Sequence, residues 1–113
     1  AMDNEQKIAA VNKYMDAFSG ADMNLIREIY ADDAVVEDPV GSEPYVGIEA
    51  IVGFYEVAFA TGAKIALSGD VRCAGNAAAF PFKVLMEGVD ISPIDVFEFN
   101  AEGKVQSMKA YWG

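Results

Sequence analysis

Histidine is missing from this chain of 113 residues, and cysteine occurs only once, as Cys73. Without histidine, the chain cannot form a Ser-His-Asp triad, a Cys-His pair or a histidine-based metal site. A single cysteine cannot form an intramolecular disulfide, and no CxxC motif or Cys/His cluster supports bound zinc. We therefore expect no metal ion, and any proton transfer must use carboxylates, tyrosines or lysines.

Basic residues are also scarce. Only 8 lysines and arginines stand against 18 aspartates and glutamates, so the formal net charge is -10. This balance argues against nucleic acid or an anionic membrane as a partner and favours a neutral or apolar ligand. No apolar run approaches the roughly 18 to 20 residues of a membrane helix, and residues 1–7, AMDNEQK, lack a signal-peptide pattern. We expect a cytoplasmic protein.

The chain is predicted to form one domain, residues 1–113. It contains no internal repeat, no low-complexity tract and no linker-like change in composition. A chain of this length buries about 65% of the surface that its unfolded form exposes, which is enough for a core without disulfides.

Three helices are predicted in the first half of the chain. Apolar residues recur with the helical period from about residue 4 to 18. Residues 19–22, SGAD, end this helix, and Asp22 is a suitable N-cap for a second. A third helix begins near Ile48, after a loop over residues 39–47 that is broken by proline and glycine. The side chains expected to face inward are Ile8, Val11, Tyr14 and Phe18, then Ile26, Ile29 and Tyr30, then Ile48, Ile51, Val52, Tyr55 and Phe59.

Strands dominate the second half. A short strand is predicted over residues 35–38, and period-two alternation over residues 64–72, 76–87, 89–100 and 104–113 indicates a long antiparallel meander. Pro81 indicates an edge or a bulge. We predict an α+β fold, in which three N-terminal helices pack on a strongly curved, mainly antiparallel sheet and enclose a cone-shaped apolar pocket. The inner face of the sheet is predicted to carry Phe80, Phe82, Val84, Met86, Pro93, Asp95, Phe97, Phe99, Met108, Ala110 and Trp112.

Two carboxylates are predicted to point toward this apolar interior. Strand alternation places Asp38 opposite Glu37, and it places Asp95 among phenylalanines and opposite Glu98. Burial raises the pKa of a carboxylic acid, and two nearby acids of unequal burial can divide into an ionised base and a protonated donor. The pattern also allows simpler interpretations, because Asp38 precedes a proline as turn residues often do, and backbone donors could satisfy Asp95.

Three tyrosines lie on the predicted inward faces of the helices. The hydroxyls of Tyr14, Tyr30 and Tyr55 could stabilise a developing oxyanion. Each of these tyrosines is also an ordinary core residue at helical spacing. From the residues alone, the prediction stops at an apolar pocket with buried acids.

Several longer segments carry a resemblance to a known family. The segments YADDAVVEDPVGSEP, IVGFYE, AFPFKV and PIDVFEFNAEGKVQSMKAYWG, in this order, resemble the bacterial Δ5-3-ketosteroid isomerases of the nuclear transport factor 2-like superfamily. The resemblance extends over essentially the whole chain. It implies a steroid Δ-isomerase that needs no cofactor, acts on a 3-oxo-Δ5-steroid and forms a homodimer through its sheet.

The resemblance also implies roles for individual residues. Asp38 matches the general base of the family, Tyr14 its oxyanion-hole tyrosine, and Asp95 the protonated acid that shares the oxyanion. The family is itself a standard example of a carboxylic acid held neutral in an apolar site. Tyr30 and Tyr55 match a hydrogen-bond network behind Tyr14. The residues expected to bind the steroid are Phe54, Phe80, Phe82, Met86, Met108 and Trp112.

Two other classes of function compete with this interpretation. Another chemistry on the same fold, such as that of a cyclase, a dehydratase or an epoxide hydrolase, is possible because fold alone does not fix function. The dehydratases of the superfamily rely on histidine, and neither Arg27 nor Arg72 suggests the Asp-Arg-Asp site of limonene-type epoxide hydrolases. The other class is a non-catalytic module that binds a steroid or another small apolar ligand.

Overall fold

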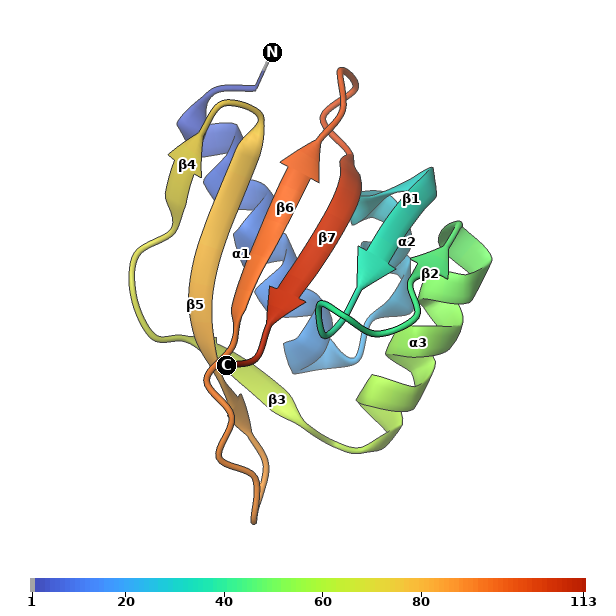
Figure 1. The fold of residues 1–113 in the computed structure, drawn as a ribbon, viewed down its shortest axis with the longest axis vertical. Helices are drawn as coiled ribbons and strands as arrows, with labels where there is room; N and C mark the ends of the chain where they lie inside the picture. The colour runs from blue at the N-terminus through green and yellow to red at the C-terminus, as the bar shows by residue number, and fades with distance from the viewer. Residues whose placement is uncertain (1) are drawn as a thin grey trace.

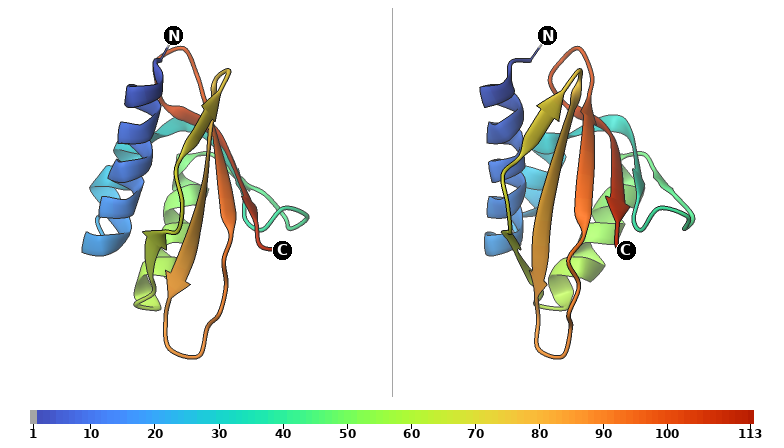
Figure 2. Two further views of the ribbon diagram at one scale, coloured as in Figure 1. Left: turned by 90° about the vertical axis from the view of Figure 1, so that its left-hand side faces the viewer. Right: turned by 60° about the vertical axis from the view of Figure 1, so that its left-hand side comes forward.

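Three helices pack against one side of a curved sheet in the computed structural model, which describes residues 2–113 (Figure 1). Seen edge-on, the helices cover one face of the sheet and leave the other face bare (Figure 2). The predicted α+β fold is therefore confirmed. The elements in chain order are α1 (Asn4–Gly20), α2 (Met23–Ile29), β1 (Tyr30–Glu37), β2 (Tyr45–Val46), α3 (Ile48–Ala60), β3 (Lys64–Leu67), β4 (Arg72–Ala74), β5 (Ala77–Leu85), β6 (Ile94–Phe99) and β7 (Val105–Tyr111).

The sheet is mixed. Its strand order is β2-β1-β7-β6-β5-β3, and β4 also pairs with β5. β1 runs parallel to β7, whereas the other pairs are antiparallel. The prediction of a mainly antiparallel sheet holds, but the first strand was placed too late, because β1 begins at Tyr30 and ends at Glu37, one residue before Asp38.

The stretch predicted as one strand over residues 64–72 was wrong in its second half, because only residues 64–67 form a strand, β3, and the next strand, β4, begins at Arg72. β3 pairs with the end of β5, from Phe82 to Leu85, and β4 pairs with its beginning, from Ala77 to Ala79. Pro81 lies where the partner of β5 changes, and its carbonyl accepts a hydrogen bond of 3.0 Å from the Ser68 N–H. A residue without an N–H is tolerated here because the regular ladder is interrupted on this side.

α1 begins with a capping box, in which Asp3 and Gln6 exchange hydrogen bonds with each other's backbone N–H. The predicted inward stripe was wrong at one position, since Ile8 is 36% exposed. The buried face runs instead through Lys7, Val11 and Tyr14, which is an i, i+4, i+7 spacing. The helix thus buries a lysine where an apolar residue was expected.

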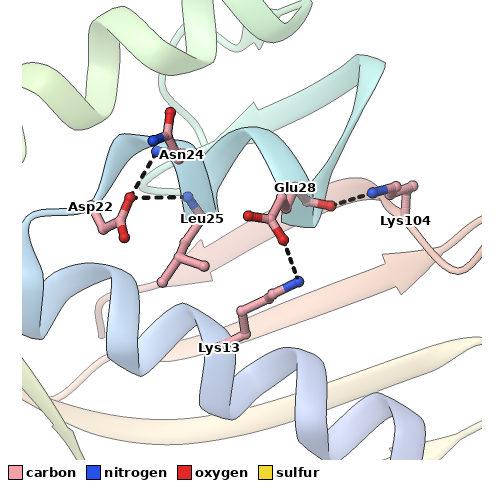
Figure 3. A network of polar contacts seen from close by, with 6 residues as sticks. All are labelled: Lys13, Asp22, Asn24, Leu25, Glu28 and Lys104. Carbon is pink, nitrogen blue, oxygen red and sulfur yellow. Dashed lines mark hydrogen bonds and ion pairs between the residues drawn. The ribbon is translucent and has the colours of Figure 1, made fainter.

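α2 is fixed at both ends (Figure 3). Asp22 is the predicted N-cap, and its carboxylate accepts hydrogen bonds from the N–H groups of Asn24 and Leu25. At the other end, Glu28 pairs with Lys13 of α1, and its backbone carbonyl accepts a 2.6 Å hydrogen bond from the ammonium group of Lys104. These contacts hold this short helix against α1 and the loop between β6 and β7.

The core lies between the helices and the inner face of the sheet. Its largest fully buried side chains are mostly aromatic or branched aliphatic, together with Met108 and Asp95, and they come from α1, α2, α3, β1, β5, β6 and β7. Within residues 2–113, no helix is long and apolar enough to cross a membrane.

Candidate active site

A cavity of about 220 Å³ opens between α1, α3 and the inner face of the sheet. Its polar groups are few, and most of its wall is hydrocarbon. Seven of the eleven site residues predicted from the sequence line it, whereas the other four are fully buried in the core and do not, namely Tyr30, Tyr55, Phe80 and Met108. The lining consists of Tyr14, Phe18, Asp38, Phe54, Ala58, Thr61, Ala63, Ile65, Phe82, Val84, Met86, Val89, Ile91, Pro93, Asp95 and Trp112.

Asp95 is the most unusual of these residues. It is the second residue of β6, and strand alternation turns it inward, as predicted, so that only 1% of it is exposed. Neither carboxyl oxygen has a hydrogen-bond partner among residues 2–113. Burial, and then the charge of Asp38, raise the pKa of Asp95 well above its usual range. A protonated Asp95 therefore presents an O–H donor to the cavity.

Asp38 lies in the same cavity but in a different environment. It follows the last residue of β1, and the loop behind it is held by a 2.8 Å hydrogen bond from the Val40 N–H to the Ala110 carbonyl. Its Oδ1 accepts a 2.8 Å hydrogen bond from Nε1 of Trp112. Burial raises the pKa of Asp38, and this indole hydrogen bond partly lowers it. Of the two acids, Asp38 is the one placed to ionise first.

The neighbouring acid, Glu37, does not share this cavity. Its carboxylate accepts a 3.1 Å hydrogen bond from the Gly41 N–H, within the loop that follows β1. Adjacent acids thus have separate surroundings, as strand alternation predicted.

The three predicted tyrosines form a chain of hydroxyls. The hydroxyl of Tyr55 lies 2.9 Å from that of Tyr14 and 2.5 Å from that of Tyr30, and all three rings are buried. Burial raises the pKa of each hydroxyl well above the usual range, so all three remain neutral donors at ordinary pH. Of the three tyrosines, only Tyr14, at one end of this row of hydroxyls, lines the cavity.

Packing also fixes the ring of Tyr14. It makes edge-to-face contacts with Phe18, Phe80 and Phe97, at centroid distances of 5.3, 6.0 and 5.2 Å. Phe80, which does not line the cavity, therefore contributes to the site by holding this tyrosine in place.

We expect Tyr55→Phe to lower the free energy of unfolding by at least about 2 kcal/mol, because it leaves the buried hydroxyls of Tyr14 and Tyr30 without their shared partner. Urea unfolding monitored by circular dichroism measures this loss. Tyr111→Phe is the matched control, since Tyr111 is 47% exposed. Equal stability of the two variants would contradict the importance of the hydroxyl chain.

Sequence reasoning missed the hydrogen bond from Trp112 to Asp38. It predicted both residues in the pocket, but they are 74 positions apart and nothing local indicates their contact. Alternation did place Val84 and Pro93 on the inner face, whereas Ala58, Thr61 and Ala63 lie at and beyond the end of α3, where no periodic signal exists. In the part of the chain that the structure describes, no three histidine, cysteine, aspartate or glutamate side chains gather closely enough to hold a metal ion.

Comparisons with known proteins identify the family of this chain. The SnoaL-like domain family matches residues 11–108. The chain belongs to this family, within the nuclear transport factor 2-like superfamily. A protein of Nocardioides simplex named steroid Δ-isomerase is 40% identical over 109 residues, which cover 92% of this chain and 87% of that protein. The resemblance identified in the sequence is thereby confirmed.

A solved structure shares the fold closely. It is the epoxide hydrolase/cyclase-like enzyme SalBIII, described for its role in pyran ring formation in the polyether salinomycin. The TM-score is 0.88 at 25% identity, and the match covers 98% of this chain and 93% of that one. The same architecture thus accompanies more than one activity.

Proposed function

We propose that this protein is a steroid Δ-isomerase, which moves the double bond of a 3-ketosteroid from the 5,6 to the conjugated 4,5 position. One observation carries the proposal. Asp95, a fully buried carboxyl group that has no hydrogen-bond partner among residues 2–113, faces the same apolar cavity as a second acid, Asp38, and a neutral tyrosine, Tyr14. The 40% identity to a protein named steroid Δ-isomerase supports it.

The proposed reaction is a proton transfer within one substrate molecule. The carboxylate of Asp38 removes a proton from C4, beside the 3-ketone, and the electron pair of that C–H bond moves into a dienolate whose negative charge lies on the ketone oxygen. Tyr14 and protonated Asp95 donate hydrogen bonds to this oxygen. Asp38 then returns the proton to C6. The product contains the same atoms as the substrate, and Asp38 is again an ionised carboxylate.

The environments of the two acids suit these different tasks. The raised pKa of Asp95 keeps its proton available for donation, while the Trp112 hydrogen bond favours the ionised form of Asp38. A low-dielectric wall strengthens hydrogen bonds to a developing oxyanion. The lining from Ala58 to Ile65 and from Phe82 to Pro93 is almost wholly apolar, as the rings of a steroid require.

The direct test is to mix the purified protein with 5-androstene-3,17-dione and follow the ultraviolet absorbance of the conjugated enone. The proposal predicts rapid growth of this absorbance. Absence of growth together with tight binding of the steroid product would favour a binding module without catalysis.

A second candidate is an epoxide-opening cyclase. The likeness to SalBIII favours it, and the same pair of acids could serve it, with Asp95 protonating the epoxide oxygen while Asp38 takes the proton of the attacking hydroxyl. A hydroxy-epoxide substrate that cyclises while the ketosteroid stays unchanged would support this candidate over the isomerase.

We expect Trp112→Phe to shift the acidic limb of the pH profile of kcat/KM to higher pH. The indole N–H lowers the pKa of Asp38, so its removal leaves burial alone to raise that pKa. Less of the base is then ionised at any pH near the transition. An unchanged pH profile would contradict the role of Trp112 in positioning and ionising the base.

We further propose that a second copy of this chain packs on the bare face of the sheet, as the resemblance to the ketosteroid isomerases implies. Ile94 and Tyr111 are paired across β6 and β7 on this face and are 46% and 47% exposed. Sedimentation velocity should detect a dimer that Ile94→Lys weakens, and a monomer at every concentration would contradict this proposal.

A further inference from the structure

Lys7 places a positive charge on the buried face of α1. It is only 5% exposed. Lysine is almost never buried unless it is paired. Among residues 2–113, no carboxylate oxygen lies within 4.0 Å of its ammonium group, whose hydrogen bond goes to the backbone carbonyl of Gly75 at 2.6 Å. This charge therefore lacks a counter-ion within the described chain.

The bond to a carbonyl does not by itself account for the burial. Lys64 and Lys104 also donate to backbone carbonyls, at the ends of α1 and α2, yet both side chains stay exposed. Lys7 is moreover the fourth residue of a 17-residue helix, close to the end at which the helix dipole is positive. A cation is unfavourable there. A negatively charged partner would offset both the cost of burying the ammonium group and its repulsion by the helix dipole.

A second cavity, of about 370 Å³, lies beside this lysine. It is bounded by the beginning of α1, the turn between β4 and β5 and the turn between β6 and β7, which meet at the top of the molecule in Figure 1. The catalytic cavity shares none of its lining residues. Met2 and Phe99 give it apolar walls, and Ala101 stands at its exposed side.

The side chains of Asn76 and Asn100 also belong to the lining of this cavity. Asn76 uses one N–H for the backbone carbonyl of Phe99, at 3.3 Å, and Asn100 uses one for the side chain of Gln106, at 3.2 Å. Each carboxamide nitrogen carries a second N–H, and an ammonium group carries three. The lining of the cavity thus combines a buried ammonium group, two carboxamide side chains and an apolar wall.

We propose that this second cavity binds a small organic monocarboxylate. The ammonium group of Lys7 holds the carboxylate, the amides of Asn76 and Asn100 complete its hydrogen bonds, and the apolar body of the ligand contacts Met2 and Phe99. A monoanion fits better than a phosphate dianion, because the net charge of -10 repels each added negative charge and the walls are mostly hydrocarbon.

The test is an NMR titration of the whole protein with benzoate, with benzamide as the neutral ligand of the same shape. Saturable shifts of the backbone N–H signals of Gly75 and Ala101 are expected with benzoate, with a Kd on the order of millimolar. Benzamide should bind at least about tenfold more weakly, since hydrogen bonds to charged groups are the stronger ones. Equal binding of both, or no saturable shift up to roughly 100 mM benzoate, overturns the proposal.

Two variants locate the binding. Lys7→Met keeps the aliphatic stem and removes the charge, and Lys13→Met is its control on the same helix, at the site of the Glu28 pair. Because Lys7→Met also removes the bond to Gly75, Ala101→Asp provides an independent variant that adds a negative charge at an exposed position of the lining, with Ala101→Ser as control. Lys7→Met and Ala101→Asp should each weaken benzoate binding at least about tenfold. Retained affinity in either one overturns the proposed site.

Discussion

Asp38→Asn is expected to retain steroid binding and to lose most turnover, by about 10² to 10⁴-fold in kcat. An asparagine keeps the size of the side chain, and its oxygen can still accept the hydrogen bond from Trp112. It cannot take up the proton that the proposed reaction removes from C4. The absorbance assay with 5-androstene-3,17-dione measures the loss.

Binding is measured separately through the fluorescence of Trp112, which is the only tryptophan in the chain and lines the cavity. Glu37→Gln is the matched control, since it neutralises the adjacent acid outside the cavity and should leave turnover almost unchanged. Full turnover in Asp38→Asn would rule out this residue as the base.

Asp95→Asn is expected to make the protein more stable than the parent at neutral pH, while the two proteins converge near pH 4. The pKa of Asp95 is raised in the folded state, so between the unfolded pKa, about 3.9, and the folded pKa the folded chain holds more protons than the unfolded chain. The stability contributed by this group is then complete at low pH and declines as pH rises, by about 1.4 kcal/mol per pH unit in that interval. Asparagine, which does not titrate, removes this decline.

Urea unfolding at a series of pH values from 4 to 8 checks this result, with exposed Asp90→Asn as the control. A stability difference that does not change with pH would mean that Asp95 is not held neutral. The same residue tests the oxyanion role, because Asp95→Ala removes the donor and should reduce kcat by about 10 to 1,000-fold. Unchanged kcat would indicate a purely structural acid.

Local periodicity accounts for much of what the sequence predicted correctly. Alternation in β6 was sufficient to turn Asp95 inward, and helical spacing was sufficient to bury Tyr14 and Tyr55. Alternation predicts on which face of the sheet a side chain lies. It does not predict whether that side chain lines the cavity or is buried behind the cavity wall. Phe80 has the expected face, yet it is covered by Tyr14 and Phe97 and does not reach the cavity.

The features that could not be predicted depend on contacts between distant segments. Hydropathy favoured Ile8 over Lys7 for the buried stripe of α1, but the turn that carries Gly75 covers Lys7 instead. Likewise, the strand predicted over residues 64–72 is replaced by β3 and β4, and their positions depend on which parts of β5 remain free to pair. A single sequence contains no local signal for either choice.

The lysines that bond to backbone carbonyls also determine how this protein should respond to salt. Three ammonium groups, those of Lys7, Lys64 and Lys104, donate hydrogen bonds to backbone carbonyls. Within residues 2–113, only Lys13 and Arg27 form ion pairs with carboxylates. With 18 acidic and 8 basic side chains, the net interaction among the charges is repulsive. Mobile cations screen this repulsion at physiological ionic strength over about 8 Å, while few attractive pairs exist to be weakened. Added salt should consequently raise the free energy of unfolding, so the protein should be more stable at high ionic strength than in dilute buffer.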